Sequence, residues 1–206
     1  MSNNYFQFRQ FTIRQQRCAM KVGTDGTLLG AWASPLISHF SPLTPHRILD
    51  VGTGTGLIAL MMAQRFPLAQ VTGIDIDADA ALQATENVAA SPFASRVTIL
   101  QHDVATMEGV FDVIVCNPPF FAKALHSPDA QRSVARHDDT LTYAQLMQHA
   151  RRLLGDDGEL SVVVPADQQG RMGSEAALAG FFKSRECAVR TSERTVGILA
   201  ADGLET

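Results

Sequence analysis

The sequence has few cysteines, and their spacing suits neither a disulfide framework nor a metal site. Cys18, Cys116 and Cys187 are its three cysteines in 206 residues, with no Cys-x-x-Cys pair and no Cys/His cluster. An apolar run long enough to cross a membrane is missing, and so is a signal-peptide pattern. We therefore expect a cytoplasmic protein without a metal site and without a membrane-spanning segment.

Excess positive charge is absent as well. The formal net charge is −4 and 18% of the residues are charged, which argues against a protein that coats nucleic acid. The N-terminus is a local exception, because Arg9, Arg14, Arg17 and Lys21 occur there with no acidic residue up to Lys21. Such a stretch is equally typical of a solvated terminus and of a phosphate-binding arm.

Short apolar, β-branched runs alternate with helical patterns along most of the chain. The predicted strands are Ile48–Val51, Val71–Ile76, Val97–Gln101, Phe111–Cys116 and Glu159–Val164. The predicted helices are Thr27–Ile37, Leu57–Phe66, Ala78–Ala90, Thr142–Leu154 and Ala176–Ser184. This alternation predicts an α/β, Rossmann-like fold, with a mostly parallel sheet, helices on both faces and ligands beyond the carboxyl ends of the strands.

Two units follow from this pattern. Residues 1–45 form an N-terminal extension, in which Thr24 or Asp25 can cap the first predicted helix. Residues 46–206 form the main domain, entered through a proline-containing linker at Ser41–Pro45. The segment Ala188–Ala200 is expected to hold one or two strands, but the sequence leaves open whether the C-terminal hairpin is complete.

A glycine-rich turn joins the first predicted strand of the main domain to its first helix. It reads Asp-Val-Gly-Thr-Gly-Thr-Gly from Asp50, and Gly52, Gly54 and Gly56 allow a sharp turn and close approach of a ligand. Dinucleotide-binding turns space their glycines G-x-G-x-x-G, and Asp50 would repel a pyrophosphate, so an NAD-dependent oxidoreductase is disfavoured. An ammonium beside Asp50, a carboxylate at the helix N-terminus and a ribose fit this turn, and S-adenosylmethionine carries all three.

Acidic residues follow the next two strands. Asp75 lies near the end of the second predicted strand, where an acid can accept both ribose hydroxyls, and Asp77 is expected to cap the next helix, although the two acids could exchange these roles. Asp103, followed by Val104, comes after the third strand, where a carboxylate could accept from an adenine amine. Taken alone, Asp103 is more typical of a solvated loop acid.

A fourth strand end carries Asn117, Pro118, Pro119 and Phe120, a sequence suited to holding a flat, amine-bearing group. The Asn side chain supplies a donor and an acceptor, and the prolines leave rigid carbonyl acceptors. The Phe ring offers a face on which a base can stack. Alone, a simple turn after a strand is as good an interpretation. The glycine turn upstream favours the interpretation that this sequence holds an amine-bearing group.

These motifs together resemble the motif series of class I S-adenosylmethionine-dependent amino-methyltransferases. The run from Lys21 to Trp32 and the Phe8-Arg-Gln-Phe11 stretch further resemble a bacterial family that methylates N6 of adenine 37 in a valine tRNA. The resemblance extends from about Phe8 to about Thr191. It implies that the cofactor is covered by a short N-terminal segment, consisting of Lys21, Gly23, Thr24 and Asp25.

The resemblance implies methyl transfer from S-adenosylmethionine to an adenine N6 in a tRNA anticodon loop, by a monomer. Asn117 and Pro118 would accept the amine N–H groups, and Phe120 would hold the base. The family motif usually ends in Tyr rather than Phe, so a guanine-N2 RNA methyltransferase remains an alternative. A protein glutamine methyltransferase and an inactive cofactor-binding subunit also remain. Arg132, Arg136 and His137 are either phosphate contacts or solvated charges.

Overall fold

The structure is a computed structural model, and it describes residues 3–33, 45–118, 141–190 and 195–202. Its centre is a seven-stranded sheet with the strand order β5-β4-β3-β6-β7-β9-β8. The strands are β3 (Arg47–Val51), β4 (Gln70–Asp75), β5 (Val97–Gln101), β6 (Phe111–Cys116), β7 (Leu154–Pro165), β8 (Phe182–Arg190) and β9 (Thr195–Asp202). The first five strands of this order are parallel, whereas β9 is antiparallel to both β7 and β8.

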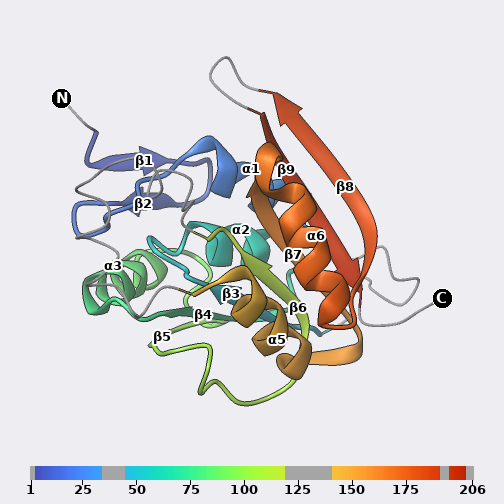
Figure 1. Cartoon of the computed structure of the whole chain (residues 1–206). Coiled ribbons are helices and arrows are strands. Elements are labelled where there is room, and N and C mark those ends of the chain that lie inside the picture. Colours follow the sequence, from blue (N-terminus) through green and yellow to red (C-terminus); the bar gives the residue numbers. More distant parts are fainter. Residues whose placement is uncertain (1–2, 34–44, 119–140, 191–194, 203–206) are drawn as a thin grey trace.

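Helices cover both faces of the sheet (Figure 1). On one face lie α1 (Thr24–Trp32), α2 (Leu57–Arg65) and α3 (Ala78–Ala89), and on the other lie α5 (Tyr143–Leu153) and α6 (Gln169–Leu178), preceded by the short 3-10 helix η2 (Ala166–Gln168). The predicted α/β fold is thereby confirmed. In the part of the chain that the structure describes, no helix is long and apolar enough to cross a membrane.

The central strands form two hydrophobic cores because successive side chains point to opposite faces of a sheet. Along β6, Val113 and Val115 belong to the core beneath α1 and α2, whereas Ile114 and Cys116 belong to the core beneath α5. All four side chains are buried. Burial on both faces explains why Val113–Cys116 is a continuous apolar run, and the sequence predicts β6 with the bounds it has.

The C-terminal hairpin, which the sequence left open, is complete within the described residues. β8 and β9 pair from Phe182↔Asp202 to Arg190↔Thr195, and β9 also pairs with β7. The helix predicted over Ala176–Ser184 is wrong, because α6 ends at Leu178 and β8 begins at Phe182. Gly180 between them has a φ of 81°, a left-handed conformation that glycine adopts without strain and that stops the helix.

The helix predicted at Thr27–Ile37 also differs. It begins earlier, at Thr24, and ends at Trp32 with Ala33 in the C-cap position, and positions 34–37 of the prediction lie outside the described residues. Gly23 occupies the N-cap position in an extended conformation and makes no side-chain cap bond. Capping by Thr24 or Asp25 was therefore a wrong expectation. Most of the proposed linker lies outside the described residues.

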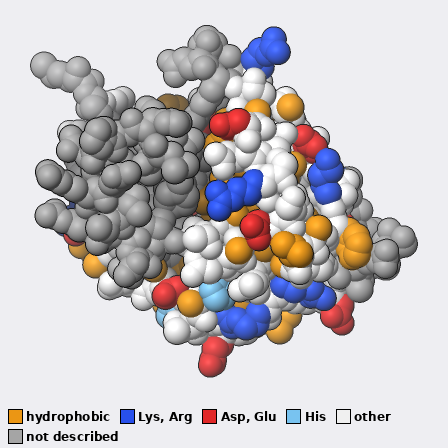
Figure 2. Space-filling model, in the orientation of Figure 1, with side chains coloured by type: hydrophobic (Ala, Val, Ile, Leu, Met, Phe, Trp, Pro, Cys, Tyr) orange, Lys and Arg blue, Asp and Glu red, His pale blue; other side chains and the backbone are white. Residues whose placement is uncertain are grey.

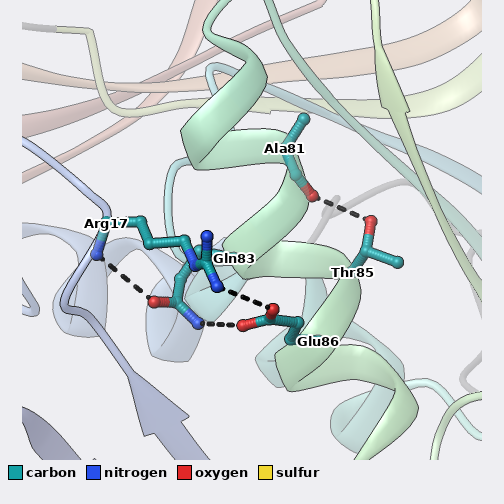
Figure 3. Close-up of polar contacts among 5 residues, drawn as sticks. All are labelled: Arg17, Ala81, Gln83, Thr85 and Glu86. Atoms are coloured by element: carbon teal, nitrogen blue, oxygen red, sulfur yellow. Dashed lines mark hydrogen bonds and ion pairs between the residues drawn. The ribbon is translucent and has the colours of Figure 1, made fainter.

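A short antiparallel hairpin near the N-terminus was not predicted. β1 (Tyr5–Gln7) and β2 (Thr12–Arg14) pair with Tyr5 opposite Arg14. The hairpin lies beside α3 (Figure 1). After β2 the chain runs along α3, where Arg17 donates from its backbone to Gln83 Oε1 at 3.4 Å and pairs with Glu86 at 3.3 Å (Figure 3). The basic N-terminus is thus folded against the main domain from residue 5 onward.

Candidate functional site

The glycine turn after β3 has the backbone that its sequence requires. Gly52, Gly54 and Gly56 have φ values of 69°, 53° and 79°, in the left-handed region where other residues are strained. A Cβ at Gly52 would meet no atom within 4 Å, so that side of the turn is open to a ligand. A Cβ at Gly56 would lie 3.3 Å from Ala84 Cβ, so Gly56 also allows α3 to approach the turn closely.

Backbone donors from this turn bind the end of β4. The N–H groups of Gly52 and Thr53 both donate to the Ile74 carbonyl at 2.9 Å, and the Gly54 N–H donates to Asp75 Oδ2 at 2.9 Å. Asp75 Oδ1 accepts the N–H of Asp77 at 3.0 Å. Each oxygen of Asp75 therefore has one backbone donor and keeps a further acceptor position, which suits a pair of ribose hydroxyls.

Asp77 has the separate structural role that the sequence predicts. It is the N-cap of α3, and its Oδ1 accepts from the backbone N–H groups of Asp79 and Ala80 at 2.8 and 3.2 Å. A side chain that accepts the first orphan N–H groups of a helix stabilises that helix. Asp75 and Asp77 thus divide two tasks: the first fixes the turn, and the second begins α3.

Asp50 is completely buried beneath the glycine turn. Its Oδ2 accepts from Thr53 Oγ1 at 2.7 Å and from the Ala59 N–H at 3.1 Å, whereas its Oδ1 has no partner among the described residues. Burial, with a smaller contribution from the charge of Asp75, raises the pKa of Asp50 to about 7. A buried acceptor without a donor suits the ammonium of an amino acid moiety, directly or through water.

Asn117 lies at the centre of the sheet, immediately after the last residue of β6. Its neighbour Cys116 pairs with Val51 of β3. Asn117 and the glycine turn therefore lie at the same edge of the sheet, beyond the carboxyl ends of β6 and β3. Asn117 Oδ1 is buried and has no hydrogen-bond partner among the described residues. A Cβ at Gly26 would lie 3.6 Å from Asn117 Nδ2, which places the first turn of α1 against this side chain.

Of the other residues of the Asn-Pro-Pro-Phe motif, the structure describes one. Pro118 is buried beside Asn117. Pro119 and Phe120 lie outside the described residues, as do the candidate phosphate contacts Arg132, Arg136 and His137.

The segment before α1 passes close to the end of β4. Cys18 is buried, and the pKa of its thiol is raised to about 11, first by burial and then by the negative charges of Asp75, Asp77 and Asp79. Further along, the Val22 N–H donates to Gln15 Oε1 at 2.8 Å. Of the four residues expected to cover the cofactor, Lys21, Gly23 and Thr24 are exposed and Asp25 is buried.

The loop after β5 brings Asp103 to the same edge of the sheet. The His102 N–H donates to the Asp75 carbonyl at 2.9 Å, which holds the loop against the end of β4. Asp103 is exposed, and its Oδ1 accepts the Ala105 N–H at 2.8 Å, while Val104 is buried. The four strand ends that the sequence singled out therefore lie together at one edge.

Asn87 is a residue of this region that the sequence analysis missed. It is buried in α3, and its Oδ1 accepts the Arg14 N–H at 2.9 Å. Its Nδ2 donates to the Arg14 carbonyl at 2.8 Å and to the Thr55 carbonyl, inside the glycine turn, at 2.9 Å. One side chain thus joins the N-terminal hairpin to the glycine turn. A polar residue on the buried face of a helix was the available signal.

The site fits S-adenosylmethionine. It offers an orphaned buried carboxylate oxygen at Asp50, two free acceptor positions at Asp75 and an open glycine turn. Across the described ranges, His, Cys, Asp and Glu form no group of three that could hold a metal ion. This fold and this turn define a class I methyltransferase, and S-adenosylmethionine is its cofactor.

Comparison with known proteins gives the same class and a particular family. A model of the methyltransferase small domain matches residues 32–196. A tRNA1(Val) (adenine(37)-N6)-methyltransferase of Bacteroides thetaiotaomicron is 47% identical over 194 residues, covering 93% of this chain and 79% of the relative. Its namesake from Parabacteroides distasonis is 48% identical over 193 residues, covering 92% and 78%. The chain belongs to the family of these tRNA1(Val) (adenine(37)-N6)-methyltransferases, so the predicted family and cofactor are confirmed.

Solved structures agree on the fold. TrmN from Thermus thermophilus superposes with a TM-score of 0.61 at 22% identity, covering 77% of this chain but 44% of that one. Magnesium protoporphyrin IX methyltransferase from Synechocystis PCC 6803, solved with bound S-adenosylmethionine, gives a TM-score of 0.58 at 19% identity, covering 78% and 71%. At these identities the likeness concerns the fold alone.

Proposed function

We propose that this protein transfers a methyl group from S-adenosylmethionine to the exocyclic N6 of adenine 37 in tRNA1(Val). The observation that carries the proposal is the buried Asn117 Oδ1, an acceptor without a partner among the described residues. Buried acceptors are nearly always paired, so this oxygen is suited to a donor that arrives with a substrate. The names of the relatives, which are tRNA1(Val) (adenine(37)-N6)-methyltransferases, indicate which amine that is.

The chemistry requires positioning more than acid–base catalysis. When bound, the cofactor supplies a methyl group already activated by a positively charged sulfur. The Asn117 side-chain carbonyl and the Pro118 backbone carbonyl accept the two N–H groups of the adenine amine, which directs its nitrogen at the methyl group. The N–CH3 bond forms as the S–CH3 bond breaks, and the amine releases a proton to water afterwards. Pro119 keeps the turn rigid, and Phe120 stacks on the base.

Each cofactor-binding residue has a proposed role. Asp50 meets the ammonium and Asp75 the ribose hydroxyls, while Gly52, Gly54 and Gly56 let the backbone approach. Asp103 and Val104 lie beside the adenine ring of the cofactor. The N-terminal extension, residues 1–45, covers the site of the catalytic domain, residues 46–206, through a segment formed by Lys21, Gly23, Thr24 and Asp25.

The substrate and setting follow from the same proposal. Bases of an anticodon loop are unpaired and can be extruded at little cost, which makes the loop the natural target. We expect the protein to act as a monomer in the cytoplasm. Phe120 keeps guanine-N2 as a second candidate, because the Asn-Pro-Pro-Phe sequence is also found in guanine-N2 methyltransferases.

The test is to incubate the protein with labelled S-adenosylmethionine and unmodified tRNA, rRNA or a release factor, and to identify the labelled nucleoside or amino acid. We expect N6-methyladenine in tRNA. N2-methylguanine or methylglutamine as the labelled product would refute the adenine assignment. Cofactor binding without transfer to any substrate would instead indicate a cofactor-binding subunit.

A further inference from the structure

The outer face of the N-terminal hairpin carries an exposed aromatic ring beside a cation. Tyr5 and Arg14 are directly opposite each other in the β1–β2 pairing, as are Gln7 and Thr12. Paired residues of an antiparallel ladder share a face, with Cβ atoms about 5 Å apart. All four residues are exposed, and Tyr5 is 52% exposed. This face therefore presents a ring, a guanidinium and two uncharged polar side chains to solvent.

The inner face of the hairpin is fixed to the domain by aromatic packing. Ile13 is fully buried, and Phe8 stacks on Phe11 with ring centroids 4.8 Å apart. Phe11 in turn meets Phe93, after α3, edge-on at 6.1 Å, while Phe6 lies 5.0 Å from Phe8 and stays 47% exposed. The outer face thus rests on a rigid base, so a ligand that binds there pays little ordering entropy.

Residues 1–21, which include the hairpin, carry a net charge opposite in sign to that of the rest of the chain. Residues 1–21 hold four cations and no acid, whereas the rest of the chain carries −8, since the whole chain is at −4. Arg9 and Arg14 are exposed. Over α5, α6 and β8, by contrast, basic and acidic side chains are interspersed (Figure 2). The N-terminal region is therefore suited to attract a polyanion.

The hairpin is also joined to the catalytic site. Asn87 holds both backbone groups of Arg14 and the Thr55 carbonyl of the glycine turn. From Arg14 the chain runs along α3, where Arg17 bonds Gln83 and Glu86, to Cys18, whose thiol pKa is raised first by burial and then by the charge of Asp75. A strand of RNA on the hairpin would thus lie near the glycine turn of the cofactor site.

We propose that the outer face of the β1–β2 hairpin, formed by Tyr5, Gln7, Thr12 and Arg14, is a platform for unpaired nucleotides of the tRNA substrate. One base stacks on the ring of Tyr5, and Arg14 binds the adjoining phosphate. Gln7 and Thr12 offer hydrogen bonds to sugar and base edges. This inference rests on the proposed tRNA substrate, and it adds a second contact outside the methyl-transfer site.

Single-stranded RNA fits this surface better than an RNA duplex does. An A-form duplex keeps its base faces stacked internally, so an isolated exposed ring gains nothing from it. An exposed aromatic ring beside a cation is the usual arrangement for sequence-tolerant binding of a single strand.

The test measures affinity for an unmodified tRNA1(Val) transcript, with S-adenosylhomocysteine present to prevent turnover, at several salt concentrations. We expect Tyr5→Ala to weaken binding by about 5- to 150-fold, which is the range for one stacked base, and Tyr5→Phe to bind like the wild type. Arg14→Ala should reduce the slope of log affinity against log salt by about one. Matched controls are Phe182→Ala and Arg190→Ala, which remove an exposed ring and an exposed cation from β8.

Two further readouts separate this inference from the proposed function. In single-turnover methylation, Tyr5→Ala should raise the RNA concentration needed for half-maximal rate and leave the saturated rate and the cofactor Kd near wild type. A wild type that methylates adenine 37, with Tyr5→Ala and Arg14→Ala binding no more weakly than the controls, would overturn the platform alone. A wild type that does not modify the tRNA would overturn the proposed function and the platform with it.

Discussion

Replacing Asn87 by Ala tests how strongly the N-terminal hairpin is joined to the cofactor turn. The change removes three hydrogen bonds: from the Arg14 N–H, to the Arg14 carbonyl and to the Thr55 carbonyl. The Thr55 carbonyl lies in buried surroundings, and leaving such a group unpaired costs about 1–3 kcal/mol. Arg14 is exposed, so water can partly replace its two bonds.

The expected loss is therefore about 2–4 kcal/mol in the free energy of unfolding, or about 4–16 °C in Tm for a chain of this size. Thr85→Ala is the matched control, because Thr85 is exposed on the same helix and, among the described residues, its hydroxyl bonds only the Ala81 carbonyl of α3 (Figure 3). That control should match or slightly exceed wild-type stability, since Ala favours helix.

Urea unfolding of both variants measures the difference, and titration with S-adenosylmethionine measures its functional consequence. Because Asn87 holds the Thr55 carbonyl in place, we expect Asn87→Ala to weaken cofactor binding and Thr85→Ala to leave it unchanged. An Asn87→Ala protein as stable as Thr85→Ala, with wild-type cofactor affinity, would refute the reasoning.

Two other predictions concern the cofactor-free protein. Burial raises the pKa of Asp50 from 3.8 to about 7, so the folded state keeps a proton that the unfolded chain releases. The free energy of unfolding should therefore fall as pH rises from about 4 to about 7, and Asp50→Asn should flatten that dependence in urea unfolding measured across this range; equal slopes for both proteins would contradict the assignment. A Cβ at Gly30 would lie 3.0 Å from Met61 Cβ, so Gly30→Ala should cost about 1–3 kcal/mol of stability. Gly26→Ala is the control, because a Cβ at Gly26 would have its nearest neighbours at 3.6 Å, an ordinary contact distance. If Gly26→Ala lost as much stability as Gly30→Ala, the close approach of α1 to α2 at Gly30 would be disproved.

The central strands were predictable because they are buried on both faces. β5 and β6 have the predicted bounds, β3 begins one residue before its prediction, and β4 both begins and ends one residue before its prediction. An apolar run bounded by turn residues is a local signal, and here the tertiary fold agrees with it. The strand ends carried the candidate site for the same reason, since parallel strands place successive carboxyl ends at one edge.

The edges of the fold depended on contacts that the sequence does not display. β8 has one exposed face and is held in place by pairing with β9, a contact that its own sequence does not display. The start of β8 therefore resembled the end of the Ala-rich helix that precedes it. β1 and β2 have three residues each, too few for a periodic signal, and Asn87 fixes them from α3. The orphaned oxygens of Asp50 and Asn117 likewise became evident only when the burial of each atom was known.

The most direct test of the central claim compares Asn117→Ala with the wild type in single-turnover methylation of an unmodified tRNA1(Val) transcript, alongside the cofactor Kd. We expect the rate of N6-methyladenine formation at position 37 to fall at least about 100-fold, because the amine is no longer directed at the methyl group. The cofactor Kd should stay near the wild-type value. Near-wild-type transfer by Asn117→Ala, or a collapse of cofactor binding that accounts for the lost transfer, would contradict the claim that Asn117 holds the target amine.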